Sequence, residues 1–357
     1  MSTNRILFIC KKRSTYGVSY GLLNSCRFLC NALEQMGNDA EIALVNDNND
    51  IDREVTKYRP THVFIEALWV VPSKFEVLIP LHPKVEWYVR LHSNTPFISS
   101  EGVAIEWIAK YNALSKKYPQ FRIACNADKM KNDIELSLGI KSVYAPNIYM
   151  PSSGAIATSP CDETKSHVSI GGFGAIRPLK NQLIQAMAAI AFANKIGKKL
   201  TYHINATRSE SYGEPNGSAT LKNIEELFKD AGQILKPHEW LDWPDFIDLV
   251  SSMDLGLQVS MSETFDIVAA DFVHVNVPIV GSKEIEWLSD SYQADCTDIK
   301  DIISHLEYAW EGRRKNRQRA NYDGLVKWNI HAWKQWESLL CHSDFAAPSG
   351  KVTVRSF

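Results

Sequence analysis

Residues 262–281, SETFDIVAADFVHVNVPIVG, decide how the second half of the chain folds. They follow the apolar run LGLQV at 255–259 and end in the short apolar segment PIVG at 278–281, and both segments are typical of buried strands. Between them, the apolar residues over 265–274 have the spacing of a helix that packs on a sheet. The stretch therefore predicts a strand, a helix and a second strand, which is the repeating unit of a parallel α/β fold.

Two carboxylates flank the start of this predicted helix. Glu263 and Asp271 are eight residues apart, and eight residues turn a helix only about 80° past two full turns, so both acids lie on nearly the same face. Ser262 or Thr264 is expected to cap the first turn, whose unpaired N–H groups are a ready site for an anion. We expect an anion-binding loop with Glu263 at its mouth, although an amphipathic helix with two solvated acids gives the same pattern.

This block resembles the C-terminal signature of retaining glycosyltransferases with two Rossmann-like domains, the GT-B architecture. That family has the pattern E-G-F-G-x4-E before a P-V-V strand. Here Glu263 matches the first Glu, Phe265 matches the Phe, and Asp271 stands in place of the second Glu, while Thr264 and Asp266 replace the two glycines. The resemblance implies that Glu263 touches the donor sugar and that Asp271 holds the ribose hydroxyls. It also puts the negative charge of Asp266 beside the expected diphosphate site.

Length and composition are those of a globular protein with two domains. The chain has 357 residues, of which 45% are hydrophobic and 22% charged. A net charge of −2 gives no overall attraction to nucleic acid or to an acidic membrane surface. No apolar run is long enough to cross a membrane, and the first ten residues lack a signal-peptide pattern. With seven cysteines and no C-x-x-C, we expect free thiols and a cytoplasmic protein.

The order of apolar runs predicts two α/β halves. Strand candidates alternate with helical patterns in the first half, and a second alternating set begins after a segment rich in Ser, Thr, Pro and Gly. We therefore expect an α/β fold of two Rossmann-like domains that face each other across a cleft. The expected parts are a domain over 1–150, a linker over 151–166, a domain over 167–325, a helix over 326–345 that crosses back to the first domain, and a tail over 346–357. Trp328, Trp333 and Trp336 are expected to anchor that helix.

A second motif follows the first predicted strand of the second half. Residues 171–181 are GGFGAIRPLKN and precede a predicted helix. Glycines let the backbone approach a bound group closely, and Arg177 and Lys180 beside a helix start favour a diphosphate. The segment resembles the family pattern G-R-L-x-P-x-K-G at Gly174, Ile176, Pro178 and Lys180, with Arg177 two positions after the family Arg. The resemblance implies a donor site formed by Gly174, Arg177 and Lys180; a loop with two solvated basic residues is the alternative.

The first half is expected to supply the acceptor side. The loop 11–17, KKRSTYG, follows the first strand, at the edge where open α/β sheets bind ligands. In the resembling family, the equivalent Gly-containing loop faces the donor, which implies a donor contact at Gly17. Lys12 and Arg13 are candidate acceptor-binding residues, or members of a basic surface loop.

His92 ends another strand at the same edge and is the best single candidate in this half. Its imidazole would bond to the donor sugar or to the acceptor hydroxyl, whereas a structural histidine is the alternative. Glu66 is a second acid near that edge, and Trp69 would form a stacking wall for an acceptor or simply pack against the protein.

Sugar transfer determines what these residues would do. The bond from the anomeric carbon to the diphosphate breaks, and fixed cations and helix N–H groups aimed at the phosphate oxygen lower that barrier by several kcal/mol. Lys180, Arg177, Glu263 and His92 are the expected catalytic residues. The sequence has no D-x-D at a strand end and no His/Cys grouping with ligand spacing, so we expect no metal and no cofactor besides the nucleotide-sugar donor. Retention of anomeric configuration is implied by the resemblance alone.

The acceptor is the least determined part. Residues 313–319 contain five basic residues in a predicted helical region. Such a helix beside the cleft would hold DNA phosphates, whereas a solvated helix face is the usual explanation. The chain also resembles phage-encoded GT-B glycosyltransferases that modify hydroxymethylated bases, which implies DNA as acceptor and the host cytoplasm as location.

Other functions stay open on the sequence alone. A UDP-sugar is the expected donor. The alternatives are a transferase with a saccharide or small-molecule acceptor, a catalytically silent module that binds a sugar nucleotide or a nucleic acid, and a nucleotide-sugar epimerase. No amphipathic membrane-facing helix is present, so no membrane insertion is expected, and the sequence does not fix the oligomeric state.

Overall fold

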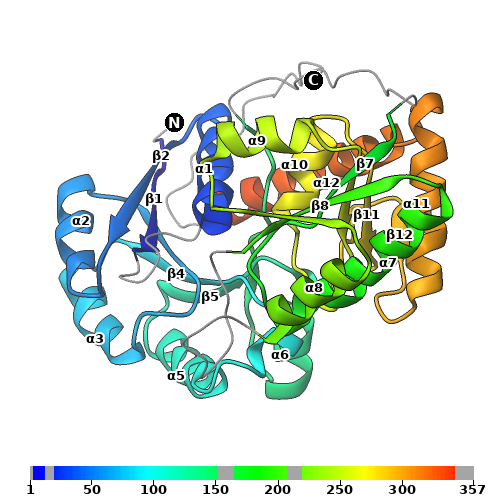
Figure 1. The fold of residues 1–357 in the computed structure, drawn as a ribbon. Coiled ribbons are helices and arrows are strands. Elements are labelled where there is room, and N and C mark those ends of the chain that lie inside the picture. The colour runs from blue at the N-terminus through cyan, green and yellow to red at the C-terminus, as the bar shows by residue number, and fades with distance from the viewer. Residues whose placement is uncertain (1–2, 13–19, 152–164, 207–218, 342–357) are drawn as a thin grey trace.

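The computed structural model describes residues 3–12, 20–151, 165–206 and 219–341 (Figure 1). These ranges contain two six-stranded sheets, one formed by each half of the chain, and every strand pair in both sheets is parallel. Figure 1 shows the first sheet in blue to cyan and the second in green to yellow. The α/β fold expected from alternating strands and helices is confirmed.

The first sheet has the strand order β2-β1-β3-β4-β5-β6. Its strands are β1 (Arg5–Lys11), β2 (Asp39–Val45), β3 (His62–Glu66), β4 (Glu86–Leu91), β5 (Phe121–Cys125) and β6 (Val143–Tyr144). The helices of this half are α1 (Tyr20–Gln35), α2 (Asp50–Tyr58), α3 (Pro72–Leu81), α4 (Thr95–Ile98), α5 (Ala104–Lys117) and α6 (Asp128–Leu138).

Helices cover both faces of this sheet, because successive side chains of a strand point to opposite sides. On one face, Phe8 of β1 and Phe64 of β3 pack with residues of α1. On the other face, Leu7 and Ile9 of β1 belong to a core formed with α2, α3 and α5. The apolar runs in the sequence are therefore strands buried on both sides.

The second sheet has the strand order β12-β11-β10-β7-β8-β9. Its strands are β7 (His167–Gly171), β8 (Lys199–Asn205), β9 (Ile234–His238), β10 (Leu255–Gln258), β11 (Ile279–Ser282) and β12 (Gln293–Ala294). The helices are η1 (Pro178–Lys180), α7 (Gln182–Lys195), α8 (Ala219–Asp230), α9 (Trp243–Ser251), α10 (Ile267–His274), η2 (Asp290–Tyr292), α11 (Ile299–Gly312), η3 (Arg313–Lys315) and α12 (Arg319–Cys341).

A glycine in β10 lets α10 lie close to this sheet. A Cβ on Gly256 would come within 2.7 Å of the Phe272 ring of α10, so a larger residue would push the helix away. The strand order also reverses between β7 and β10, which are neighbours although β8 and β9 come between them in sequence. In open parallel sheets, ligands bind at the carboxyl edge beside such a reversal.

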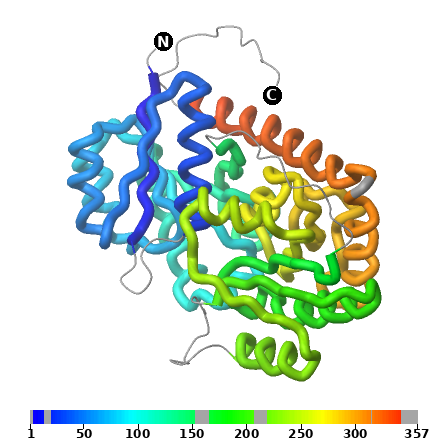
Figure 2. The backbone as a smooth tube through the Cα atoms, turned by 45° about the horizontal axis from the view of Figure 1, so that its top comes forward, coloured from blue at the N-terminus to red at the C-terminus, as the bar shows by residue number. Residues whose placement is uncertain are grey.

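The last helix crosses from the second half to the first. Helix α12 begins at Arg319, where Leu325 belongs to the core of the second sheet, and its later residues Ala332 and Trp336 join the core beneath the first sheet. The indole N–H of Trp336 donates to the carbonyl of Pro146 at 2.8 Å. Figure 2 shows α12, in red, running from α11 to α1. The predicted crossing is confirmed, with the helix starting seven residues earlier than 326.

The predicted helix across the basic run 313–319 is wrong. Helix α11 ends at Gly312, η3 follows, and α12 begins at Arg319, so the run forms a corner between two helices. Arg313 lies 3.1 Å from the ring centre of Trp310 and 3.5 Å from the Asp254 carboxylate. The run therefore presents no continuous basic helix face.

Two further expectations concern thiols and membranes. The six cysteines in the described ranges are free thiols, four of them buried, as expected. Among the helices that the structure describes, none has the length and apolar character needed to cross a bilayer.

Candidate active site

The two motifs of the second half follow the two strands that flank the strand-order reversal. The glycine-containing loop leaves β7, the loop with Glu263 leaves β10, and hydrogen bonds join them. The Met261 N–H donates to the Leu179 carbonyl at 2.8 Å, and the Asn181 amide donates to the Val259 carbonyl at 3.0 Å. The topology of the sheet thus brings together two motifs that are far apart in the sequence.

Lys180 and Glu263 meet at this junction. The Lys180 amine donates to a Glu263 carboxylate oxygen, and it lies 3.6 Å from the Asp266 carboxylate. The side chains of Lys180 and Glu263 are 17% and 10% exposed, so the pair is largely but not fully withdrawn from solvent. Burial by itself lowers the pKa of Lys180, but the charges of Glu263 and Asp266 hold it above its ordinary value. Burial likewise raises the pKa of Glu263, but Lys180 holds it below its ordinary value.

The helix cap was predicted wrongly. Asp266, rather than Ser262 or Thr264, is the N-cap of α10, and its Oδ1 accepts the Ala269 N–H at 2.9 Å. Asp266 has φ 57°, in the left-handed region that Asp and Asn tolerate better than most residues. Because α10 begins at Ile267, Glu263 lies in the loop before the helix.

Asp271 lies inside α10 and is buried. Its Oδ1 accepts hydrogen bonds from the Tyr149 hydroxyl at 2.7 Å and from the Trp243 indole N–H at 2.9 Å. Burial raises the pKa of Asp271 to about 7, although both hydrogen bonds favour the charged form. Asp271 therefore links α10 to α9 and to the segment that follows β6.

Phe265 is also buried and packs in the core of the second half. Its ring lies 5.8 Å from that of Trp287 and 5.7 Å from that of Trp328, centre to centre. The Phe265 carbonyl accepts the Trp287 indole N–H at 2.7 Å. Its side chain thus anchors the loop that carries Glu263 and Thr264.

Gly174 and Arg177 shape the loop after β7. Gly174 has φ 122°, in the region that favours glycine, and its N–H donates to the Asn205 side chain at 2.9 Å. The Arg177 guanidinium lies 5.1 Å from the ring centre of Phe97 in α4. Arg177 therefore reaches from the second half to the first.

A buried ion pair lies beneath the carboxyl edge of the first sheet. His92 Nε2 is 2.5 Å from a Glu66 oxygen, and the same oxygen accepts a hydrogen bond from Arg90 at 3.0 Å. Burial raises the pKa of Glu66, but the charges and hydrogen bonds of Arg90 and His92 hold it below its ordinary value. Burial lowers the pKa of His92 against the opposing charge of Glu66. The edge is thus built on a carboxylate shared by Arg90 and His92.

Two asparagines that the sequence analysis missed connect the two halves. The Asn94 amide donates to the Glu263 carbonyl at 2.5 Å, and the Asn126 amide donates to the Thr264 hydroxyl at 3.1 Å. Asn126 also contacts His92 Nδ1 at 3.2 Å. Both asparagines follow strand ends, β4 and β5, which is the sequence signal that could have identified them.

Three buried acceptor oxygens at this edge have no hydrogen-bond donor. They are Glu66 Oε1, Asn94 Oδ1 and Asn126 Oδ1. Leaving a buried acceptor unpaired costs about 1–3 kcal/mol, so three of them at one edge of the sheet are a pattern expected where a ligand supplies the donors.

The remaining candidates of the first half surround this edge or lie outside the described ranges. The Trp69 indole donates to the Glu66 carbonyl at 2.9 Å, and the Lys11 amine lies 5.7 Å from the Trp69 ring centre. Lys12 is exposed, and its N–H donates to the Val45 carbonyl at 2.7 Å. Arg13 and Gly17 lie outside the described residues.

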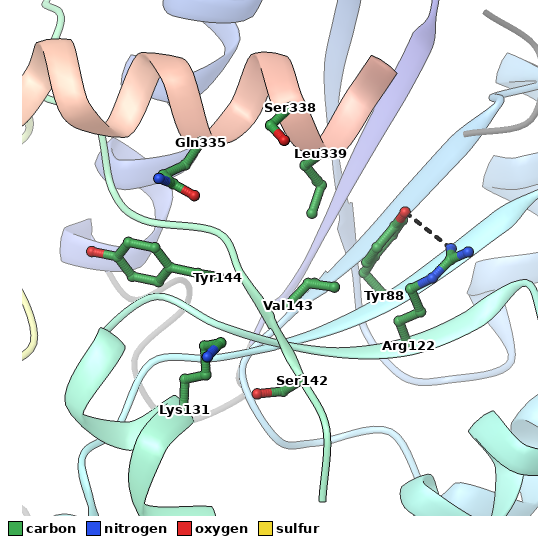
Figure 3. A pocket seen from close by; sticks show the side chains of 9 residues that line it. All are labelled: Tyr88, Arg122, Lys131, Ser142, Val143, Tyr144, Gln335, Ser338 and Leu339. Carbon is green, nitrogen blue, oxygen red and sulfur yellow. Dashed lines mark hydrogen bonds between the residues drawn. The ribbon is translucent and has the colours of Figure 1, made fainter. Parts of the chain in front are cut away.

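A separate pocket of about 350 Å³ lies between α12 and strands β4 to β6 (Figure 3). Tyr88 and Arg122 form one side of it, joined by a hydrogen bond of 3.3 Å, and Gln335, Ser338 and Leu339 line it from α12. None of the motif residues lines this pocket. In the part of the chain that the structure describes, no group of three or more His, Cys, Asp or Glu side chains is arranged to hold a metal ion.

Comparison with known proteins identifies the architecture. No protein-family model and no curated protein sequence matches the chain. Solved structures do match. A trehalose-6-phosphate synthase, OtsA, is similar with a TM-score of 0.70 and 12% identity, over 95% of this chain and 99% of that one.

Two other structures are similar over the same span. The UDP-forming α,α-trehalose-phosphate synthase from Burkholderia xenovorans has a TM-score of 0.63 and 11% identity, over 97% of this chain and 100% of that one. The sucrose-phosphate synthase from Thermosynechococcus elongatus has a TM-score of 0.63 and 10% identity, over 95% and 100%. Identities this low establish the fold alone, and the expected GT-B architecture is confirmed.

Proposed function

We propose that this protein is a metal-independent glycosyltransferase that moves a sugar from a UDP-sugar to an acceptor hydroxyl with retention of anomeric configuration. The observation that carries the proposal is the contact between Lys180 and Glu263 at the strand-order reversal, formed by two loops whose residues resemble the donor-binding motifs of such enzymes. Structures of similar fold include a UDP-forming synthase and a trehalose-6-phosphate synthase studied for glycosyl transfer with retention.

The contacts of these residues support a role for each in the proposed reaction. When the glycosidic bond to the diphosphate breaks, negative charge grows on a phosphate oxygen, and Lys180 and Arg177 are the cations of the loop after β7 that would stabilise it. Glu263 lies beside Lys180, and its carboxylate would accept a hydrogen bond from a hydroxyl of the donor sugar. His92 is held by Glu66 on one ring nitrogen and by Asn126 on the other, so both nitrogens are occupied and its ring would form part of the wall of the site rather than remove a proton.

For the acceptor, we favour a saccharide or similar polyol over hydroxymethylated DNA. The unpaired oxygens of Glu66, Asn94 and Asn126 need several hydrogen-bond donors, and a saccharide carries more hydroxyl donors than a single hydroxymethylated base. A phage DNA-modifying role would need a phosphate-binding surface, and the basic run expected to form one is a corner in which Arg313 is committed to Trp310 and Asp254.

The decisive experiment measures nucleoside diphosphate release from UDP-, GDP- and ADP-sugars. Each donor is tested alone, with a panel of mono- and disaccharides, and with hydroxymethylated duplex DNA. Release that depends on a UDP-sugar and a saccharide is expected, whereas release that depends on DNA would reverse the acceptor assignment. Donor conversion without any acceptor would indicate an epimerase, and binding without turnover would indicate a silent module.

Variants test the site itself. Lys180→Ala and Glu263→Ala should each lower the transfer rate by about 10²-fold or more. Lys195→Ala, which removes an exposed lysine of α7 paired with Glu307, is the matched control and should leave the rate unchanged. Transfer that survives both site substitutions would show that the donor binds elsewhere.

A further inference from the structure

The first turn of α10 already holds an anion, the side chain of Asp266. One carboxylate oxygen accepts the Ala269 N–H at 2.9 Å, and the other lies 3.6 Å from the Lys180 amine without a hydrogen-bond donor. The side chain is only 1% exposed. A carboxylate therefore takes the backbone N–H group and the cation that would otherwise face a bound phosphate.

The backbone at this position shows that a side chain is not required. With φ 57° and ψ 87°, Asp266 has a left-handed conformation that glycine adopts without strain. The motif that the sequence resembles has glycine here, and a glycine would leave the Ala269 N–H free for a ligand and Lys180 paired with Glu263 alone. The backbone conformation at position 266 therefore does not itself require a carboxylate side chain.

We propose that Asp266 is an internal competitor of the donor's diphosphate, which it mimics by holding the tip of α10 and Lys180 until a nucleotide sugar displaces or neutralises it. This inference rests on the proposed function, because it names a residue that regulates the same site. It predicts that donor binding is coupled to the charge of a single carboxylate.

Burial, together with the charge of Glu263, favours the neutral form of Asp266. Glu263, on the same loop, and Lys180, from η1, are the charged groups that act on it. Burial and the Glu263 charge raise the pKa of Asp266 to about 7, against the opposing effects of Lys180 and the Ala269 N–H. Protonation removes the negative charge that repels a diphosphate, so donor affinity should fall as the pH rises. If only the protonated form admits the donor, the affinity at pH 6 is about tenfold that at pH 8.

The test measures binding of UDP-glucose to the whole protein by calorimetry between pH 6 and pH 8. UDP-glucose is preferred over UDP because its diphosphate is esterified at both ends and keeps a constant double negative charge in this range, whereas a terminal phosphate titrates near pH 6. Asp266→Asn keeps a capping oxygen and tolerates positive φ. It should bind UDP-glucose about tenfold more tightly than the wild type at pH 8 and lose the pH dependence. Asp266→Gly should do the same.

Two comparisons make the outcome decisive. Asp298→Asn removes the same charge from another helix cap, that of α11, and should leave both affinity and its pH dependence unchanged. Circular dichroism verifies that each variant is folded. Unchanged or weaker binding by Asp266→Asn would overturn the inference. It would also be overturned if the wild type needs a divalent cation to bind UDP-glucose and Asp266→Asn no longer binds that cation. Absence of any UDP-sugar binding in all variants would instead reject the proposed function.

Discussion

The carboxyl edges of the two sheets contact each other through Asn94 and Asn126, but their charged side chains are arranged differently. At the first edge, Arg90 and Glu66 are both fully buried, and Arg90 also donates to the Ala145 carbonyl and the Asn147 side chain. At the second edge, Lys180 faces two acids and is still 17% exposed. The first arrangement is neutral and closed, whereas the second holds one cation against two carboxylates.

This difference indicates a structural role for the charges at the first edge and a ligand-binding role for those at the second. The Arg90–Glu66 pair is fully buried and holds His92 in place, and it leaves a single Glu66 oxygen, Oε1, without a donor. A cation shared by two acids at a partly exposed position can exchange one of them for a phosphate. Removing charges at the first edge should therefore affect stability, and removing charges at the second edge should affect binding.

The largest effect is expected at the first edge. Arg90→Met leaves the Glu66 carboxylate buried without its main partner and should lower the free energy of unfolding by about 3–5 kcal/mol, measured by urea denaturation. The matched control is Arg122→Met on the neighbouring strand, whose pair with Glu86 is 38% and 21% exposed. That change should cost about 1 kcal/mol or less. An equal loss of unfolding free energy in both variants would show that the buried pair has no special structural role.

The next effect concerns the unpaired oxygens of the first edge. Asn126→Ala removes an amide that contacts His92 and Thr264 and an oxygen without a donor. It should lower kcat/KM for the saccharide acceptor or donor by roughly tenfold to a hundredfold, corresponding to about 1–3 kcal/mol for a lost buried hydrogen bond. Asn132→Ala, on the exposed face of α6, should be neutral. A loss of stability without a change in kinetics would make Asn126 a purely structural contact.

Much of this fold could be predicted from the sequence because its strands are buried on both faces. Phe121–Cys125 stands out as an apolar segment interrupted by Arg122 alone, and β5 has those bounds. The crossing of α12 was also predictable from Trp328 and Trp336, whose indoles donate to the carbonyls of Asn147 and Pro146. Local composition was sufficient wherever one element buries one recognisable face.

The site was less predictable because its details depend on partners that are distant in sequence. Asp271 is enclosed by Tyr149, which is 122 residues away, and by Trp243. The capping role of Asp266 depends on a positive φ that no spacing rule indicates. Asn94 and Asn126 follow strand ends but lack any periodic pattern, and their contacts depend on a loop of the other half that is distant in sequence.

A third prediction sharpens the comparison at the second edge. Since the pKa of Asp271 is about 7 when folded and about 4 when unfolded, the native state binds the proton more tightly, and stability falls as the pH rises between these values. Asp271→Asn keeps an acceptor for Tyr149 and Trp243 but cannot ionise. Relative to the wild type, it should gain roughly 2–3 kcal/mol of stability from pH 5 to pH 8, measured by thermal or urea unfolding at each pH.

Donor binding by the same variant decides between two roles of Asp271. UDP-glucose affinity close to that of the wild type is expected if Asp271 serves only to join α9, α10 and the segment after β6. A tenfold or greater loss of affinity would instead show that its carboxylate holds the ribose, as the resemblance in the sequence implies, and that Tyr149 and Trp243 give way to the donor.

The smallest effect is expected for an ion pair that joins the two edges at the surface. Lys129 of α6 donates to both carboxylate oxygens of Glu284, each at 2.9 Å, but the two side chains are 43% and 23% exposed. Such pairs contribute about 1 kcal/mol or less and are screened by salt. Lys129→Ala should therefore change UDP-glucose affinity less than about threefold at low ionic strength and not at all at about 1 M salt. A tenfold loss that persists in high salt would mean that this exposed pair, rather than the asparagines beneath it, holds the two halves together around the donor.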